Sequence, residues 1–349
     1  MSGPTETQKP PGMNRWIVTA IALVVIIMAG IAFYYQAGKE TVPAADALPV
    51  VRVGVLQYGT VNWELDTVKH HGLDAKEGVN IEVVPLASKN ATAVALQGGA
   101  VDVIVTDWIW VSRQRASGLD YSFFPYSIAA GGIVVRPDSG IHQLADLRGR
   151  KIGIAGGPVD KSWLLLQAYA RKTLDVNLSE IVEPVYGAPP LLNELILKNE
   201  ISANLTFWNF EARLRAKGMQ QLITIPEVIR ALVSEPEVPV VGWVFSDSWA
   251  AKNPSAVKGL LKASQAAKKL LGDSDAEWER LRPSMEAADE AEFVALRDSF
   301  RDGIPKESPA RDAKAAAEVF SVLVEFGGAE LVGDERELSP GTFWTGPLD

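Results

Sequence analysis

The sequence predicts an α/β protein of two doubly wound lobes, preceded by one transmembrane helix. Short apolar runs alternate with helical stretches from residue 50 onward, and a second block repeats this alternation from residue 133. Residues 16–35 form an uncharged apolar run. Strands that alternate with helices are typical of parallel sheets covered by helices, so both blocks are expected to form α/β lobes.

The composition limits the chemistry that the chain can perform. Of its 349 residues 47% are hydrophobic and 22% are charged, which is typical of an ordered protein with about two domains. A net charge of −9 argues against nucleic acid as a partner. The absence of cysteine excludes disulfides, thiolate metal sites, catalytic cysteines and a lipid-modified N-terminal cysteine. With only three histidines, two of them adjacent, we expect no metal site and no cofactor.

Residues 16–35 are expected to form a transmembrane anchor. As a helix with a rise of about 1.5 Å per residue, this run spans a hydrocarbon core of about 30 Å. Lys9 and Arg15 precede it, so the positive-inside rule keeps residues 1–15 in the cytoplasm and sends the body outward. Residues 36–49 are expected to be a linker. A cleaved signal peptide is the alternative interpretation of the apolar run.

The first lobe is expected to comprise residues 50–132 and 243–349. Apolar runs predict its first strands, and more polar stretches between them predict helices. The strands are expected at 50–56, 81–86, 101–107 and 121–128, and the helices at 63–71, 91–97 and 108–116. Residues 240–247 predict a strand that returns to this lobe. Four amphipathic helices are then expected to pack back on it, at 254–271, 276–285, 289–302 and 309–326.

The second lobe is expected to comprise residues 133–242. Its strands are expected at 133–137, 180–187 and 202–208, with helices at 162–172 and 191–198 and a glycine-rich loop ending the segment 144–157. In each lobe one helix leads into a strand through a comparable connection. Gly98 or Gly99 is expected to end the first helix in the left-handed conformation, and Asn199 the second.

Three segments resemble one protein family. Residues 144–154 (LADLRGRKIGI), 96–102 (LQGGAVD) and 253–257 (NPSAV) are similar to motifs of substrate-binding proteins of ABC transporters of the nitrate/sulfonate/taurine type. The resemblance extends over residues 51–271 and implies the type II periplasmic binding fold, in which a two-segment hinge joins the lobes and a small ligand is enclosed between them. It also implies a permease and an ATPase as partners, and a place at the periplasmic face of the bacterial inner membrane.

Strand ends and helix starts that face the cleft supply the candidate ligand-binding residues. These are Gln57, Tyr58, Thr60, Ser88, Thr106, Asp107, Trp108, Gly157, Lys161, Ser162, Tyr186, Trp208 and Asn209. Thr60, Ser88 and Asp107 could instead act only as helix caps, and the aromatic residues could belong to the core. If Asp107 faces the cleft, an amine-bearing ligand is favoured over sulfonate or nitrate.

We expect a binding protein and no enzyme, because no Ser/His/Asp set is visible. Two alternatives stay open. The chain could be a membrane-tethered sensor or scaffold with the same fold. It could also be a biosynthetic enzyme similar to the pyrimidine synthases of thiamine biosynthesis, although the cysteine-rich motif of those enzymes has no counterpart here.

Overall fold

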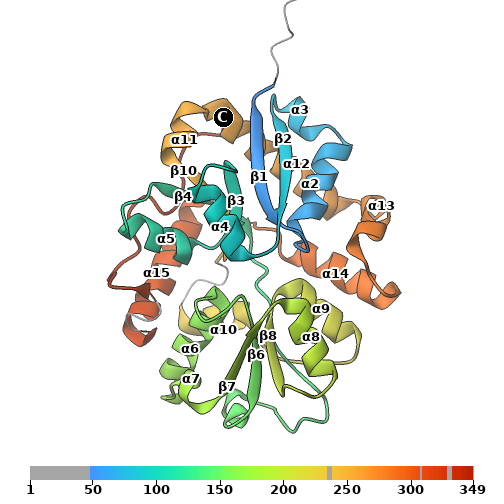
Figure 1. Ribbon diagram of the computed structural model, residues 1–349, viewed down its shortest axis with the longest axis vertical. Helices are drawn as coiled ribbons and strands as arrows, with labels where there is room; N and C mark the ends of the chain where they lie inside the picture. The colour runs from blue at the N-terminus through green and yellow to red at the C-terminus, as the bar shows by residue number, and fades with distance from the viewer. Residues whose placement is uncertain (1–47, 234–237, 307–308, 328–331, 349) are drawn as a thin grey trace, which may run out of the picture. The chain divides into compact units, whose positions relative to one another are not determined.

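The computed structural model describes residues 48–348 except 234–237, 307–308 and 328–331. These residues form two lobes, each built around a five-stranded sheet (Figure 1). The expected cytoplasmic tail, transmembrane helix and nearly all of the linker lie outside the described residues. Within the described part, no helix has the length and apolar character needed to cross a membrane.

Lobe 1 contains the sheet with strand order β2-β1-β3-β10-β4. Its strands are β1 (Val50–Leu56), β2 (Asn80–Leu86), β3 (Val103–Thr106), β4 (Tyr121–Ser127) and β10 (Val241–Ser246). Its helices are α2 (Val61–His70), α3 (Leu73–Lys76), α4 (Lys89–Gln97), α5 (Trp108–Ala116), α11 (Asp247–Lys252), α12 (Pro254–Asp273) and α13 (Asp275–Met285). Val51, Val53 and Val55 of β1 are all buried, as expected for a central strand near which helices pack.

Lobe 2 repeats this plan with the strand order β7-β6-β8-β5-β9. Its strands are β5 (Gly132–Val135), β6 (Lys151–Ala155), β7 (Glu183–Gly187), β8 (Ala203–Thr206) and β9 (Gln220–Thr224). Its helices are η1 (Leu144–Leu147), α6 (Lys161–Leu174), α7 (Leu178–Ile181), α8 (Pro189–Leu197), α9 (Trp208–Ala216) and α10 (Ile225–Leu232). The prediction of two α/β lobes built on one plan is confirmed.

One strand in each sheet departs from the parallel arrangement. β10 runs antiparallel to β3 and β4, and β5 runs antiparallel to β8 and β9. Each of these strands enters its sheet directly from the other lobe. It therefore starts at the edge where the parallel strands end, and runs in the opposite direction.

Two crossings join the sheets of the two lobes. Residues 128–131 join β4 to β5, and the described end of the second crossing, residues 238–240, leads into β10. Gly131 in the first crossing has φ 83°, and a Cβ atom there would lie 2.1 Å from the carbonyl oxygen of Thr206. Only glycine fits this position. The two crossings correspond to the two-segment hinge that the family resemblance implies.

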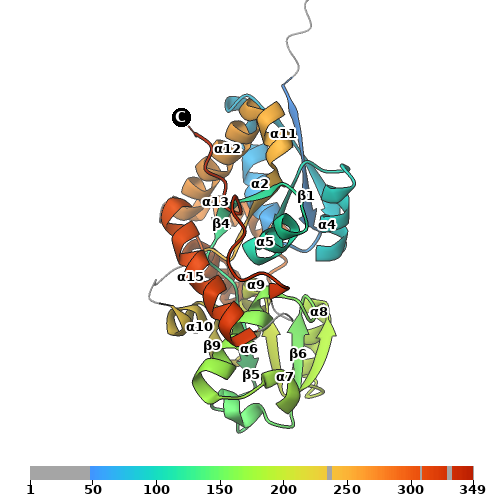
Figure 2. The ribbon, with the colours of Figure 1, turned by 90° about the vertical axis from the view of Figure 1, so that its left-hand side faces the viewer.

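The C-terminal helices do not all pack where the sequence predicted. α12 and α13 pack against α2 of lobe 1, whereas α14 (Glu290–Asp302) packs against α9 of lobe 2 (Figure 1). α15 (Pro309–Gly327) packs against α6 and α10 of lobe 2 (Figure 2). Arg213 of α9 forms an ion pair with Glu292 of α14, and Arg171 donates to the carbonyl oxygen of Phe326. The expectation that all four helices pack on lobe 1 is therefore wrong for α14 and α15.

Candidate ligand-binding site

A cavity of about 130 Å³ lies between the two lobes. We call it the interlobe cavity. Lobe 1 contributes the end of β1, the start of α4 and the end of β3, and lobe 2 contributes the starts of α6 and α9. Its polar and aromatic lining residues are Thr60, Lys89, Thr92, Thr106, Asp107, Tyr126, Ser127, Asp160, Lys161, Phe207, Trp208 and Asn209.

Four charged side chains meet in this cavity, two from each lobe. Lys89 Nζ donates to Asp107 Oδ2 at 2.6 Å and lies 3.9 Å from Asp160 Oδ2 in the opposite lobe. Lys161 Nζ lies 4.0 Å from Asp160 Oδ2 and 5.3 Å from the ring centroid of Phe207. The four charges sum to zero, so the wall presents separated positive and negative groups with no excess of either sign.

The close pairing keeps Lys89 and Asp107 charged. Burial would lower the pKa of Lys89, but the carboxylates of Asp107 and Asp160 outweigh it and raise the pKa above its ordinary value. Burial would likewise raise the pKa of Asp107, but Lys89 and Lys161 hold it below its ordinary value. Among the described residues, no group of three His, Asp or Glu side chains could share a metal ion.

A buried carboxylate oxygen in the cavity wall has no hydrogen-bond partner among the described residues. Asp160 is 1% exposed, and its Oδ1 caps α6 by accepting from the Ser162 N–H at 2.9 Å. Its Oδ2 accepts no hydrogen bond, because both lysine ammonium groups stand too far away. A buried acceptor without a donor costs free energy. A ligand that donates a hydrogen bond to this oxygen removes that cost and binds more tightly for it.

The remaining wall suits a small polar molecule with one flat side. The hydroxyl groups of Thr60, Thr106 and Ser127 and the amide of Asn209 can donate and accept, and Phe207 and Trp208 offer aromatic surface. This combination of a few polar groups with an apolar wall is typical of small-molecule sites.

Six of the sequence-predicted residues line the interlobe cavity: Thr60, Thr106, Asp107, Lys161, Trp208 and Asn209. Thr60 stands at the start of α2, where its side chain makes no capping hydrogen bond. Asp107 caps α5, which is one of its two interpretations, since Oδ1 accepts from the Trp110 N–H at 2.8 Å, while Oδ2 accepts from Lys89 in the cavity wall. Because both of its oxygens are engaged, Asp107 gives no support to the preference for an amine ligand.

Two predicted residues lie away from the cavity. Trp108 is 1% exposed in the core, and its indole N–H donates to the Pro239 carbonyl at 2.9 Å, so it forms no wall of the cavity. Tyr186 is 43% exposed near the end of β7, the edge strand of its sheet. A residue on the edge strand is displaced sideways from the central strands β6 and β8, whose ends approach the cavity.

The other five predicted residues surround the cavity without lining it. Gln57 is exposed after β1, and Tyr58 packs edge-on against Phe210 of lobe 2 at 6.1 Å between ring centroids. Ser88 caps α4 by accepting from the Ala91 N–H at 3.1 Å. Gly157 and Ser162 flank the Asp160 loop, and the buried hydroxyl of Ser162 has no hydrogen-bond partner within the described ranges. For Ser88, the interpretation as a helix cap is the one that the structure supports.

Sequence reasoning missed Lys89, Tyr126, Asp160 and Phe207 as lining residues. A signal existed for two of them. Asp160 directly precedes a helix, where aspartate is a preferred cap, and Lys89 directly follows the cap Ser88. Tyr126 lies inside an apolar strand and Phe207 between a strand and a helix, where nothing local distinguishes them from core residues.

Known structures share this fold. The aliphatic sulphonate binding protein SsuA from Escherichia coli superposes with a TM-score of 0.65 at 19% identity, over 85% of this chain and 97% of that one. The alkanesulfonate-binding protein SsuA from Xanthomonas axonopodis pv. citri, bound to MOPS, gives a TM-score of 0.67 at 17% identity, over 86% of this chain and 99% of that one. At these identities the likeness concerns the fold alone.

Sequence comparison assigns the chain to a family. The arginine-binding extracellular protein ArtP of Bacillus subtilis (strain 168) is 30% identical over 128 residues, which are 36% of this chain and 48% of the relative. The match thus spans about half the length of that curated relative. The family model described as NMT1/THI5 like matches residues 67–274, which is more than half of the chain. The chain therefore belongs to the NMT1/THI5-like family.

Proposed function

We propose that this protein is an extracytoplasmic solute-binding protein that encloses a small polar organic molecule between its lobes and delivers it to an ABC importer. The observation that carries the proposal is the interlobe cavity, in which Lys89 and Asp107 of one lobe face Asp160 and Lys161 of the other. A ligand bound there touches both lobes at once, so it stabilises the state in which they are close together.

The side chains of the cavity also favour a binding role over a catalytic one. Its lysines stand beside carboxylates. For Lys89 these carboxylates outweigh burial and leave the pKa raised, which disfavours a neutral nucleophilic amine. The cavity can recognise a molecule by hydrogen bonds and charge. The ligand supplies a donor for Asp160 Oδ2 and an acceptor for the hydroxyl groups.

The partners are a membrane permease and its ATPase, as for the importers of this protein class. The apolar run at residues 16–35 supports tethering to the outer face of the membrane. Tethering would raise the concentration of the binding protein at the permease. Cell fractionation tests this part. The proposal expects the full-length chain in the membrane fraction, whereas a shortened chain in the soluble fraction would show cleavage.

A thermal-shift screen of the full chain tests the binding function. The panel contains nitrate, alkanesulfonates, free amino acids, carboxylates and pyrimidines. A true ligand raises the melting temperature in a concentration-dependent way, because a ligand at 100 times its Kd stabilises the folded state by about 2.7 kcal/mol. The shift disappears in Lys161→Met.

Lys217→Gln is the matched control, since Lys217 is an exposed lysine beyond the end of α9 and does not line the cavity. This variant should respond to the ligand like the parent. A shift that survives Lys161→Met and Asp160→Asn together would contradict binding in the interlobe cavity.

A further inference from the structure

A second cavity, of about 280 Å³, lies at the two crossings between the lobes. We call it the hinge cavity. Its walls come from residues 128–131 of the first crossing, Val238 of the second, and parts of α9, β9, α10 and α14. Ala129, Ala130 and Trp208 line both cavities and therefore stand between them.

The hinge cavity contains a buried carboxyl group that forms no direct contact with a cation among the described residues. Glu211 of α9 is 5% exposed, and within the described part of the chain its side chain makes no hydrogen bond or ion pair. Burial, together with the charge of Glu227, outweighs the charge of Arg215 and raises the pKa of Glu211 to about 7. A buried acid in this state gains most from a ligand that brings a positive charge and hydrogen-bond donors.

The outer part of the same cavity has the opposite charge. Arg215 and Arg230 are exposed, line the cavity, and form no ion pair with any other described residue. Arg215 follows Glu211 by four positions on α9, so the two side chains share one face of the helix. Asp302 of α14 adds a second carboxylate, and these four charges sum to zero.

This arrangement excludes ligands with charge of one sign. A simple cation would have to pass the two exposed guanidinium groups of Arg215 and Arg230, and a simple anion would meet a buried carboxyl group. A small molecule that carries one positive and one negative charge complements both the carboxyl group and the guanidinium groups. We propose that the hinge cavity binds a small zwitterion, such as a free amino acid, with its ammonium group on Glu211 and its carboxylate on Arg215 and Arg230.

The hinge cavity and the interlobe cavity have different charged residues, so the hinge cavity can bind its ligand whatever the interlobe cavity binds. A ligand in the hinge cavity can also affect the movement of the lobes. Both crossings contribute to the wall, so a ligand in the hinge cavity contacts the segments that must change when the lobes move.

Isothermal titration calorimetry on the full chain at pH 8 tests the proposal. The probes are glycine, L-alanine and L-leucine, which differ in size, together with two analogues that carry a single charge. Isopentylamine, which is leucine without its carboxyl group, keeps only the ammonium group at this pH, and N-acetyl-L-leucine keeps only the carboxylate. We expect saturable binding of at least one free amino acid, and at least tenfold weaker binding of both single-charge analogues.

Two variants locate the binding. Glu211→Gln should weaken it at least tenfold, and Arg230→Gln, a change at an exposed position that leaves the fold intact, should weaken it several-fold. Lys217→Gln lies outside the cavity and should bind like the parent.

Three results would overturn the proposal. The first is that no free amino acid binds, and the second is that isopentylamine binds as tightly as L-leucine. The third is that binding survives Glu211→Gln and vanishes in Lys161→Met, in which case the amino acid occupies the interlobe cavity. That last result would leave the proposed solute-binding function standing while removing the hinge site.

Discussion

At the scale of single residues, a few charged side chains determine the chemistry of the interlobe cavity. Asp107 and Lys161 could be predicted from the sequence because Asp107 lies between the end of β3 and α5 and Lys161 is the first residue of α6, and side chains at such positions reach a cleft. The approach of Lys89 to Asp160 could not, because the two residues belong to different lobes. This contact forms only when the two lobes lie side by side, so no local sequence pattern predicts it.

Lys89 provides the first prediction. Lys89→Met removes the cation that faces Asp107 and Asp160, so we expect the free energy of unfolding at pH 7 to fall by about 1 to 3 kcal/mol. Urea unfolding measures this loss. Lys76→Met is the control, because Lys76 is exposed, and it should change stability by less than about 0.5 kcal/mol. Equal effects of both variants would contradict the assigned role of Lys89.

Glu211 provides a prediction of opposite sign. Its pKa in the folded protein is about 7, raised by burial above the usual value of an unfolded glutamate. Between about pH 4.5 and 7 the unfolded chain therefore releases a proton that the folded chain keeps, so stability falls as pH rises through this window. Glu211→Gln should remove that fall and stabilise the protein at pH 8 by about 1 to 3 kcal/mol.

Urea unfolding at pH 5 and pH 8 measures the difference. Glu200→Gln replaces an exposed glutamate and should leave the pH dependence unchanged. Arg215 favours the ionised form of Glu211 but burial outweighs it, so a loss of stability at pH 8 in Glu211→Gln would contradict this account.

At the scale of elements, helix ends were the most predictable feature. Gly99 after α4 has φ 69° and Asn199 after α8 has φ 61°, so the predicted left-handed endings are confirmed in both lobes. The physical reason is local, because glycine and asparagine tolerate this conformation better than other residues. No tertiary contact is needed to predict it.

Asn199 allows a test of this account. Asn199→Ala should lower the free energy of unfolding by about 1 kcal/mol, because alanine resists the left-handed region, whereas Asn199→Gly should be neutral or slightly stabilising. Thermal unfolding of the two variants separates these outcomes. If Asn199→Ala were more stable than the parent, the left-handed conformation at residue 199 would not be the reason for asparagine at the end of α8.

The end of lobe 2 was the least predictable region. α9, β9 and α10 had no counterpart among the expected elements. One signal was present, because Thr224 and Glu227 form a capping box at the start of α10 with Pro226 between them. β9 is an edge strand with partly exposed residues, so it lacks the strict alternation by which a strand is recognised.

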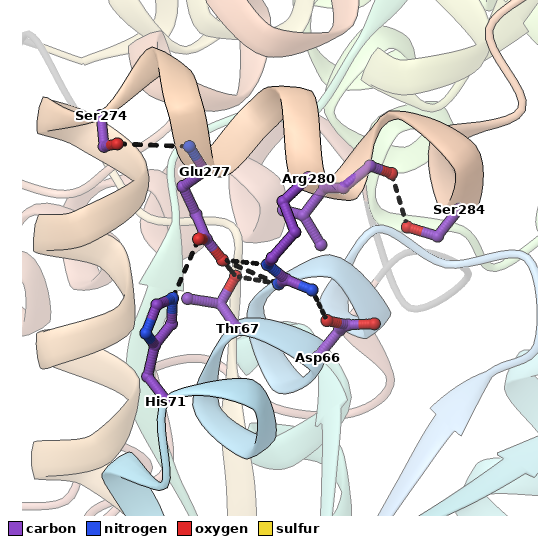
Figure 3. A network of polar contacts seen from close by, with 8 residues as sticks. Asp66, Thr67, His71, Ser274, Glu277, Arg280 and Ser284 are labelled. Carbon is purple, nitrogen blue, oxygen red and sulfur yellow. Dashed lines mark hydrogen bonds and ion pairs between the residues drawn. The ribbon is translucent and has the colours of Figure 1, made fainter.

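A polar network fixes α13 on α2 (Figure 3). Glu277 is 5% exposed and accepts hydrogen bonds from Thr67 at 2.9 Å, His71 at 2.9 Å and Arg280 at 2.7 Å. Burial opposes its charge, but the hydrogen bonds from Arg280, His71 and Thr67 prevail and lower its pKa to about 2. The network therefore stabilises the fold while Glu277 is ionised.

The pH dependence follows from this lowered pKa. The stabilisation is complete above about pH 4.5, where the unfolded glutamate is also ionised, and is lost as the pH falls toward 2. Glu277→Gln should cost about 1 to 3 kcal/mol at pH 7 and flatten the acid part of the stability profile. Glu279→Gln, in an exposed ion pair, should cost less than about 0.5 kcal/mol. Identical acid profiles for the parent and Glu277→Gln would contradict this account.

At the scale of the whole molecule, the sequence predicted the two lobes but not how the C-terminal helices join them. Apolar periodicity shows that α14 and α15 each have a buried face, but it does not say which partner covers that face. Trp63 of lobe 1, Trp208 of lobe 2 and Phe300 of α14 pack together, with ring centroids 6.1 to 6.4 Å apart. The lobes are thus connected through side-chain packing as well as through the two crossings.

Native mass spectrometry of the full chain, purified gently from its own host, tests the central claim that the interlobe cavity holds a small solute. We expect one small molecule retained per chain, absent from Lys161→Met and present in Lys217→Gln. Re-adding that molecule should raise the melting temperature of the parent. A chain that carries no small molecule, and that no member of the solute panel stabilises, would contradict the claim.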